Sequence, residues 1–343
     1  MEFTMGGQLT IRVEPSDVGK RVSLRTATGD GKGRSPRFTD TVGVLTSWAD
    51  GTISVVRRDG RTVHLAESAL VAGKVVPAAP ARRRGLPAAG VRELAEVAAR
   101  GWPAPETGRI GDWTVRAAGG WTGRANSAYR SGDGPPDLDR IGAWYADRGL
   151  PARLQVTTGA AGTDELLDAA LDREGWRAER HAVVLVAALA PLADREPDSR
   201  VVIGPGPDDR WLEGCSAARH DPAMARRVLA AGPWVRFAAV AGDDEAPAAV
   251  GRCVVDGRWA GFAALEVAAR HRGKGLAGAV LGELARAALA EGASAAHLQV
   301  ETDNAPARAL YERLGFAEHH HYHYRVNFSA LKLKDRASWP ETR

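Results

Sequence analysis

Hydrophobic and polar positions alternate in the first quarter of the chain. The alternation covers Val18–Arg25, Val42–Trp48, Thr52–Arg57 and Thr62–Leu65, and a period of two is typical of half-buried strands. Ala49-Asp50-Gly51 and Arg58-Asp59-Gly60-Arg61 separate the last three runs, and Asp-Gly pairs favour tight hairpin turns. We therefore expect a small SH3-like β-barrel over residues 1–77, which we interpret as a docking or stabilising module.

The pattern changes after the barrel. Residues 78–87 are rich in proline and alanine without periodicity, which predicts an extended linker. Residues 88–195 and 200–328 then mix helical periodicity with short apolar runs, so we expect two α/β (α+β) domains with mixed sheets. Residues 329–343 form a tail for which we predict no element.

The two mixed regions repeat one order of elements: helix, strand, helix, strand. In the first region these are Asp137–Arg148, Arg153–Thr157, Asp164–Glu174 and His181–Ala187. In the second they are Gly275–Glu291, Ala296–Glu301, Ala305–Leu314 and Glu318–Val326. Leu154-Gln155-Val156 and Leu298-Gln299-Val300 occupy equivalent positions, and we interpret the repeat as a tandem duplication.

A glycine-rich turn in the second region carries the main chemical signal. Arg272-Gly273-Lys274-Gly275-Leu276-Ala277 follows an apolar strand, Ala260–Val267, and opens a helix. The free N–H groups and the dipole of a helix start attract an anion, and glycines let the backbone approach it. The sequence therefore predicts a pyrophosphate site here.

The first region has Asp133-Gly134-Pro135-Pro136 at the equivalent place. The prolines remove backbone donors, so we expect no such site in that copy. An alternative exists for the second copy, because Gly273, Gly275 and Gly278 also satisfy the G-x-G-x-x-G spacing of dinucleotide-binding folds. Too few strand–helix units follow the turn to build such a fold.

The turn resembles the cofactor loop of the GNAT acetyltransferase superfamily. A second motif of that family is matched by Asn304, Ala307, Leu310, Tyr311, Gly315 and Phe316. More widely, the chain resembles actinobacterial members that have an N-terminal SH3-like barrel, a degenerate first GNAT repeat and a segment like that at residues 116–127, some of which are N-acetylglutamate synthases. The resemblance implies that acetyl-CoA is the co-substrate. It would be bound by Leu265, Val267, Arg272, Gly273, Lys274, Gly275, Leu276, Ala277, Asn304 and Tyr311.

The same resemblance implies acetyl transfer to a primary amine of a small molecule, with an amino acid such as glutamate as a candidate. A protein amine as acceptor and a non-catalytic acyl-CoA sensor are the alternatives. Tyr311 would protonate the leaving thiolate, because a phenol carries a proton at neutral pH. Glu266 is a carboxylate in an apolar run; burial would suit it as a general base, with Glu301 and a water relay as alternatives. Asn304 would contact the cofactor or cap its helix.

Two further groups of polar residues invite a functional interpretation. On a strand, His319, His321 and His323 would share one face and would span too far to converge on one metal ion, so we expect no metal. We expect these rings to be solvated or packed; the alternative is that some of them bind an acidic acceptor, because the last strand of this fold borders the acceptor pocket. A turn in the first region carries Arg116, Trp121, Arg124 and Asn126. It would either form a local network or hold a carboxylate, and Trp234 and Arg236 are further candidates for the acceptor site.

Composition narrows the class of protein. The net charge of +4 is spread thinly over 343 residues, which does not favour nucleic acid as a partner. Two cysteines and the lack of a long apolar run are consistent with a cytoplasmic protein that needs no membrane. The sequence leaves a homo-oligomer open.

Overall fold

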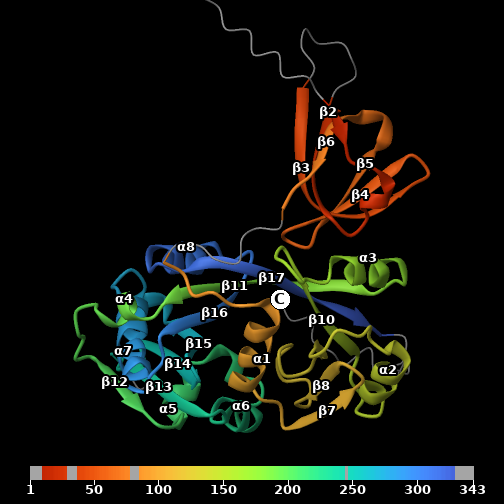
Figure 1. The fold of residues 1–343 in the computed structure, drawn as a ribbon. Coiled ribbons are helices and arrows are strands. Elements are labelled where there is room, and N and C mark those ends of the chain that lie inside the picture. Colours follow the sequence, from red (N-terminus) through yellow and green to blue (C-terminus); the bar gives the residue numbers. More distant parts are fainter. Residues whose placement is uncertain (1–9, 29–36, 78–84, 244–245, 329–343) are drawn as a thin grey trace, which may run out of the picture.

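A computed structural model describes residues 10–28, 37–77, 85–243 and 246–328. Figure 1 shows a small β-domain standing above a larger α/β body. Most of the expected linker, residues 78–84, and the whole expected tail, residues 329–343, lie outside the described residues. No helix of the described part is both long and apolar enough to cross a membrane.

The β-domain contains six strands in the order β1-β6-β2-β3-β4-β5. Their bounds are Ile11–Arg12, Arg21–Thr28, Arg37–Ala49, Thr52–Arg57, Thr62–Ala66 and Leu70–Val75 for β1 to β6. The expected Asp-Gly hairpin is confirmed, since Asp50 and Gly51 have φ angles of 50° and 71° between β3 and β4. The first long strand begins later than predicted, because a 3-10 turn over Pro15–Asp17 and Gly19, with φ 92°, precede it.

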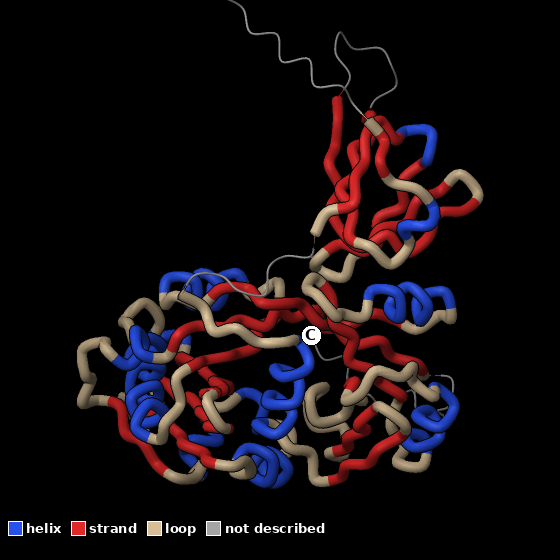
Figure 2. The backbone as a smooth tube through the Cα atoms, in the orientation of Figure 1, coloured by secondary structure: helices blue, strands red, loops and turns tan. Residues whose placement is uncertain are grey.

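The body is built on one eight-stranded sheet with the order β10-β17-β11-β16-β15-β14-β13-β12. The strands of the first copy in this sheet are β10 (Ala152–Thr158) and β11 (Arg177–Ala188). Those of the second copy are β12 (Val201–Gly204), β13 (Trp234–Val240), β14 (Ala249–Asp256), β15 (Trp259–Val267), β16 (Ala295–Glu301) and β17 (Ala317–Asn327). Figure 2 shows this sheet running through the body in red.

The two copies exchange their last strands. β17, the last strand of the second copy, lies between β10 and β11 of the first copy. In return, β11 lies between β16 and β17 of the second copy. Both copies also contain a parallel contact before their last strands, Ala128↔Leu154 in the first and β15 with β16 in the second. The duplication read from the sequence is therefore visible in the topology, and neither copy has a complete sheet without the other.

Different helices cover the two faces of the sheet. On one face, which we call the α7 face, α4 (Ala190–Ala193), α7 (Leu276–Ala290) and α8 (Ala305–Arg313) supply Leu192, Leu284 and Tyr311 to a shared core. On the opposite face, the α1 face, lie α1 (Val91–Gly101), α5 (Asp209–Glu213) and α6 (Pro222–Leu229). Alternate residues of each strand point to opposite faces, which explains why Val183 and Val184 belong to different cores.

The rest of the first copy forms a separate layer. β7 (Glu106–Ile110), β8 (Trp113–Ala117) and β9 (Tyr129–Arg130) make a three-stranded antiparallel sheet. This sheet shares a core with α2 (Leu138–Ala146), α3 (Glu165–Arg173) and β10. Helices α2 and α7, which hold equivalent positions in the two copies, lie at opposite ends of the body (Figure 1).

Candidate active site

The site begins where two parallel strands part. β15 and β16 pair from Trp259↔Ala295 to Phe262↔Leu298, and both continue past this point, to Val267 and Glu301. The register of β15 against β14 shifts nearby, and Ala264 has a φ of 50°. A β-bulge of this kind bends a strand, so the edge of β15 beyond Phe262 separates from β16.

The glycine-rich turn lies between the end of β15 and the start of α7. Gly273 and Gly275 have φ angles of 75° and 78°, and a Cβ added at either would meet no described atom within 4 Å. Residues 272–275 are exposed. Within the described backbone, the N–H groups of residues 273–278 have no carbonyl partner, and the first helical bond runs from Ala279 N to Gly275 O. The turn thus presents free donors at a helix N-terminus, which is the geometry of an anion site.

Cations surround this turn. Arg272 and Lys274 are exposed, and the Arg272 Nε group donates to the Val267 carbonyl at 3.3 Å. Arg195 also contributes, because its guanidinium lies 3.2 Å from the position of a Cβ on Gly278. Sequence reasoning did not identify Arg195, since it lies about 80 residues before the turn and only the packing of the segment after β11 against α7 brings it there. The residues present fit an anionic, phosphate-bearing co-substrate.

Tyr311 lies in the core that contains the strand separation. Its ring packs edge-to-face against Phe316 at 5.8 Å, and it belongs to the same buried cluster as Phe262 and Leu298. Burial raises the pKa of Tyr311 to about 12, so the hydroxyl keeps its proton at neutral pH. Tyr311 is therefore available as a proton donor.

Glu266 lies on β15 beyond the strand separation and contacts Ser216, in the 3-10 turn between α5 and α6. Its Oε1 atom accepts hydrogen bonds from Ser216 N and Ser216 Oγ, each at 2.8 Å. The expectation of a buried carboxylate is wrong, because Glu266 is only half-buried. Glu266 pairs with Val250 of β14, and the two bonds from Ser216 fix the orientation of its carboxylate. Glu301 ends β16 and is exposed.

The remaining residues expected to bind the co-substrate hold structural positions around the turn. Asn304 caps α8, where its side chain accepts a hydrogen bond from Ala307 N at 3.2 Å. Leu265 packs against the core under α7, and Val267 pairs with Ala249 of β14 on the edge away from β16. Leu276 is buried and Ala277 half-buried at the start of α7.

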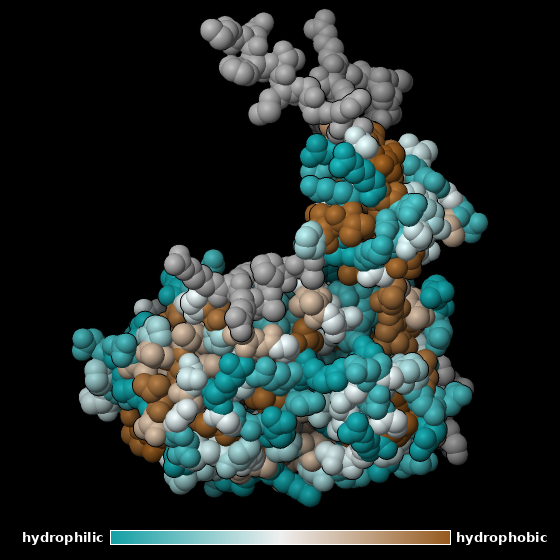
Figure 3. All heavy atoms as spheres, in the orientation of Figure 1, coloured by the Kyte–Doolittle hydropathy of each residue, from teal (hydrophilic) through white to brown (hydrophobic). Residues whose placement is uncertain are grey.

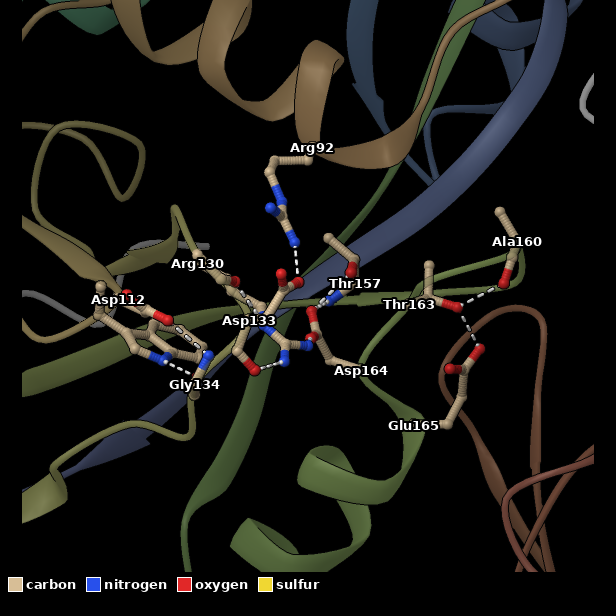
Figure 4. Close-up of polar contacts among 12 residues, drawn as sticks. Arg92, Asp112, Arg130, Asp133, Gly134, Thr157, Ala160, Thr163, Asp164 and Glu165 are labelled. Carbon is tan, nitrogen blue, oxygen red and sulfur yellow. Dashed lines mark hydrogen bonds and ion pairs between the residues drawn. The ribbon is translucent and has the colours of Figure 1, made fainter.

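The equivalent turn of the first copy is filled by its own side chains (Figure 4). Asp112 Oδ2 accepts the N–H of Gly134 at 2.7 Å, and Asp133 forms an ion pair with Arg92 of α1. Arg130 donates to the carbonyl of Asp133 at 2.6 Å and pairs with Asp164 at 2.8 Å. Carboxylates and a backbone carbonyl of this turn thus bond the N–H of Gly134 and the guanidinium groups of Arg92 and Arg130.

A cavity lies beside that first copy, away from the glycine-rich turn. It measures about 910 Å³ and lies between the β-domain and the start of α3. Exposed apolar side chains of both parts, among them Val42, Val75 and Leu166, occur here, and Figure 3 shows brown surface at this junction. Among its described lining acids, Asp133 pairs with Arg92 and Asp164 with Arg130, whereas buried Glu165 accepts from Gly159 N and Thr163 Oγ1. Size alone does not make this cavity the reaction site.

The histidine-rich strand β17 does not have the expected alternation. The register of β11 with β17 shifts near Glu318, and His319 Nε2 bonds the carbonyl of Ala89. His323 instead bonds buried Asp168 at 2.8 Å and stacks on His181. The expectation that His319 shares a face with His321 and His323 is wrong because the irregularity rotates it. The described residues contain no group of His, Cys, Asp and Glu that could hold a metal ion.

The first-copy turn with Arg116 and Asn126 forms a local network. Arg116 is buried and donates to the carbonyl and the hydroxyl of Ser127, while Asn126 makes four hydrogen bonds to the turn's backbone. In the second copy, Arg236 stacks on Trp234 at 4.3 Å. Neither Trp234 nor Arg236 is among the described residues that line the small pocket beside Phe262 and Leu298.

Comparisons with known proteins agree with this geometry. Residues 88–325 match a family model described as the C-terminal part of the probable histone acetyltransferase Rv0428c, and residues 16–74 match that of the Rv0428c N-terminal Sm-like domain. The predicted barrel thus corresponds to a domain described as Sm-like.

Two curated relatives match most of the chain. The probable histone acetyltransferase Rv0428c of Mycobacterium tuberculosis is 32% identical over 314 residues, which cover 90% of this chain and 94% of the relative. The uncharacterized N-acetyltransferase YobR of Bacillus subtilis is 30% identical over 247 residues, which cover 69% of this chain and 98% of YobR. A solved GCN5-related N-acetyltransferase from Kribbella flavida has a similar fold, with a TM-score of 0.50 at 16% identity over 69% of this chain and 95% of that one. The chain therefore belongs to the Rv0428c family of GNAT-fold N-acetyltransferases.

Proposed function

We propose that this protein transfers the acetyl group of acetyl-CoA to a primary amine of a small molecule, and that the second copy alone is active. The observation that carries the proposal is the exposed turn at residues 273–278, whose free N–H groups stand beside Arg272, Lys274 and Arg195. When bound, acetyl-CoA supplies an activated thioester and a diphosphate. The turn would hold the diphosphate, and the free edge of β15 would guide the pantetheine arm of acetyl-CoA toward Tyr311.

The chain's own residues account for the proton movements of the transfer. The amine nitrogen forms a bond to the carbonyl carbon while the carbon–sulfur bond breaks. The proton lost by the nitrogen would pass to Glu266, directly or through a water, because the Ser216 contacts hold only one of its carboxylate oxygens. Tyr311 would protonate the departing sulfur, since its pKa of about 12 keeps it neutral before the reaction.

A protein amine is the second candidate acceptor, because one relative is described as a probable histone acetyltransferase. The pocket beside the strand separation admits only a small group of the acceptor. It has room for about 30 Å³ and is walled by the end of α1 and by a loop of the first copy.

The proposal is tested by two measurements on the full chain. Calorimetry should show one molecule of acetyl-CoA bound per chain, and a free-thiol assay should show CoA release only when an amine is supplied. Two molecules bound per chain would show that the first copy is active. Binding without release for any small amine or lysine peptide would favour a sensor instead of an enzyme.

A further inference from the structure

A loop of the first copy, residues 117–126, is fixed against the second copy. Asn126 holds it from inside, accepting from Ala118 N and Gly120 N and donating to the carbonyls of Trp121 and Thr122, all at 2.7–2.9 Å. Trp121 Nε1 donates to the carbonyl of Ala217 in the second copy at 2.7 Å.

The backbone of this loop is strained at one position. Thr122 has a φ of 57°, which is an outlier for a β-branched residue. Such strain persists only where the surroundings enforce it, and it concentrates at functional sites. Here Trp102 Nε1 bonds the Thr122 hydroxyl and Asn126 Nδ2 bonds the Thr122 carbonyl, which holds this conformation.

This loop also carries Arg124. Its guanidinium stacks on Trp102 at 4.1 Å, and Trp102 stacks in turn on Trp121, with the rings 5.5 Å apart and nearly parallel at 2°. Arg124 has no hydrogen bond or ion pair with any residue of the described chain. The neighbouring Arg252 differs, because it donates to three backbone carbonyls. Arg124 is thus oriented by aromatic stacking while its N–H donors stay available.

Arg124 lines the small pocket at the strand separation. The same pocket is lined by Phe262 and Leu298, the last paired residues of β15 and β16, and by Gln299. Asp256 is the one acidic residue among the described residues that line this pocket. Its carboxylate accepts a hydrogen bond from Arg100 Nε at 2.6 Å. The pocket therefore carries an uncompensated positive charge next to the place where the acetyl group would be transferred.

We propose that this pocket receives the carboxylate of the acceptor and that Arg124 binds it, so that the rest of the acceptor, with its amine, lies outside the pocket at the strand separation. The acceptor class is a small amine that carries a carboxylate, as a free amino acid does. A guanidinium binds a carboxylate through two parallel hydrogen bonds. Because stacking on Trp102 already orients the guanidinium of Arg124, little further side-chain entropy is lost when the carboxylate binds. The inference rests on the proposed function and specifies its substrate.

The test compares each amino acid with its own amide, which keeps the amine and lacks the carboxylate charge. For the wild type, kcat/KM in the thiol-release assay should be about 10- to 100-fold higher for the acid, the range expected for a hydrogen-bonded charge. In Arg124→Gln that ratio should fall below about threefold, and Arg124→Lys should keep part of it.

Arg236→Gln is the matched control, because Arg236 also stacks on a tryptophan but lies outside the pocket. It should keep the wild-type ratio, and acetyl-CoA affinity by calorimetry should be the same in all variants, which also reports on folding. Equal turnover of acids and amides by the wild type, or an unchanged ratio in Arg124→Gln, would overturn this inference alone. A preference for lysine peptides would overturn both this inference and the small-molecule acceptor of the proposed function. A failure of the wild type to bind acetyl-CoA would overturn the proposed function and this inference with it.

Discussion

Replacing Gly275 with glutamate tests the anion site at the start of α7. The added side chain has space, since a Cβ at this position meets no described atom within 4 Å. It would, however, place a negative charge among the free N–H groups. The repulsion between the glutamate charge and a phosphate charge about 4 Å away amounts to about 1 kcal/mol in bulk water and about 4 kcal/mol at an effective dielectric constant of 20. We therefore expect a loss of acetyl-CoA affinity between about 5-fold and 1,000-fold.

Backbone strain contributes separately and must be controlled. Gly275 has a φ of 78°, and a residue with a Cβ in this region loses roughly 1–2 kcal/mol of stability. Gly292, with a φ of 101° and equally open surroundings, follows the other end of α7. Gly292→Glu should therefore lower the melting temperature as Gly275→Glu does, while acetyl-CoA affinity stays at the wild-type value.

Calorimetry with acetyl-CoA and thermal denaturation without it separate the two effects. The expected pattern is weakened binding in Gly275→Glu alone, with Gly275→Ala close to the wild type. If Gly275→Glu bound acetyl-CoA as tightly as Gly292→Glu does, the diphosphate would lie elsewhere and our account of the turn would be refuted.

Three further predictions concern the acid, a buried histidine and the contact between the copies. Tyr311→Phe should lower kcat at least about 100-fold with acetyl-CoA affinity within about twofold by calorimetry; an unaltered kcat would deny Tyr311 the acid role. Burial lowers the pKa of His297 to about 4, so stability should fall by up to roughly 3 kcal/mol as the pH drops from 6.5 to 4. Urea denaturation at pH 7 and pH 5 should show that the free energy of unfolding falls less in His297→Gln than in the wild type. An equal fall in both proteins would contradict this prediction. Asp168 is buried against His323 and Arg325, so Asp168→Asn should lower the free energy of unfolding by about 3 kcal/mol or more. Asp172 also pairs with Arg325, but its side chain is 58% exposed, so Asp172→Asn should lower it by less than about 1 kcal/mol. Equal losses in the two variants would show that the buried pair does not stabilise the contact between the copies.

Local patterns predicted much of the fold because local physics determines it. The helix predicted over Gly275–Glu291 is α7, Leu276–Ala290, since its apolar spacing and its glycine start act within a few residues. The hairpin at Asp50 and Gly51 was predictable for the same reason. The motif residues around Gly275 and Tyr311 likewise lie where a strand, a turn and a helix must follow one another.

Features that depend on distant partners could not be predicted. The exchange of β11 and β17 pairs residues more than 100 positions apart, and no periodicity encodes it. Glu266 was expected to be buried because its neighbours are apolar, but which edge of β15 is covered depends on where β16 leaves it. The surroundings of Arg124 depend on stacking between two tryptophans that only the folded chain brings together.

The position of β11 also affects how the protein is made. This strand is complete at Ala188, but its neighbours in the sheet begin at Ala295 and Ala317. At roughly 5–20 residues per second, the ribosome needs several seconds to supply them. During that time Ala182–Ala187, a segment entirely buried in the finished protein, has both edges free to pair with other chains. Translation that stops before β16 would therefore release a product prone to aggregate, and the yield of protein should depend on protection of this segment by chaperones.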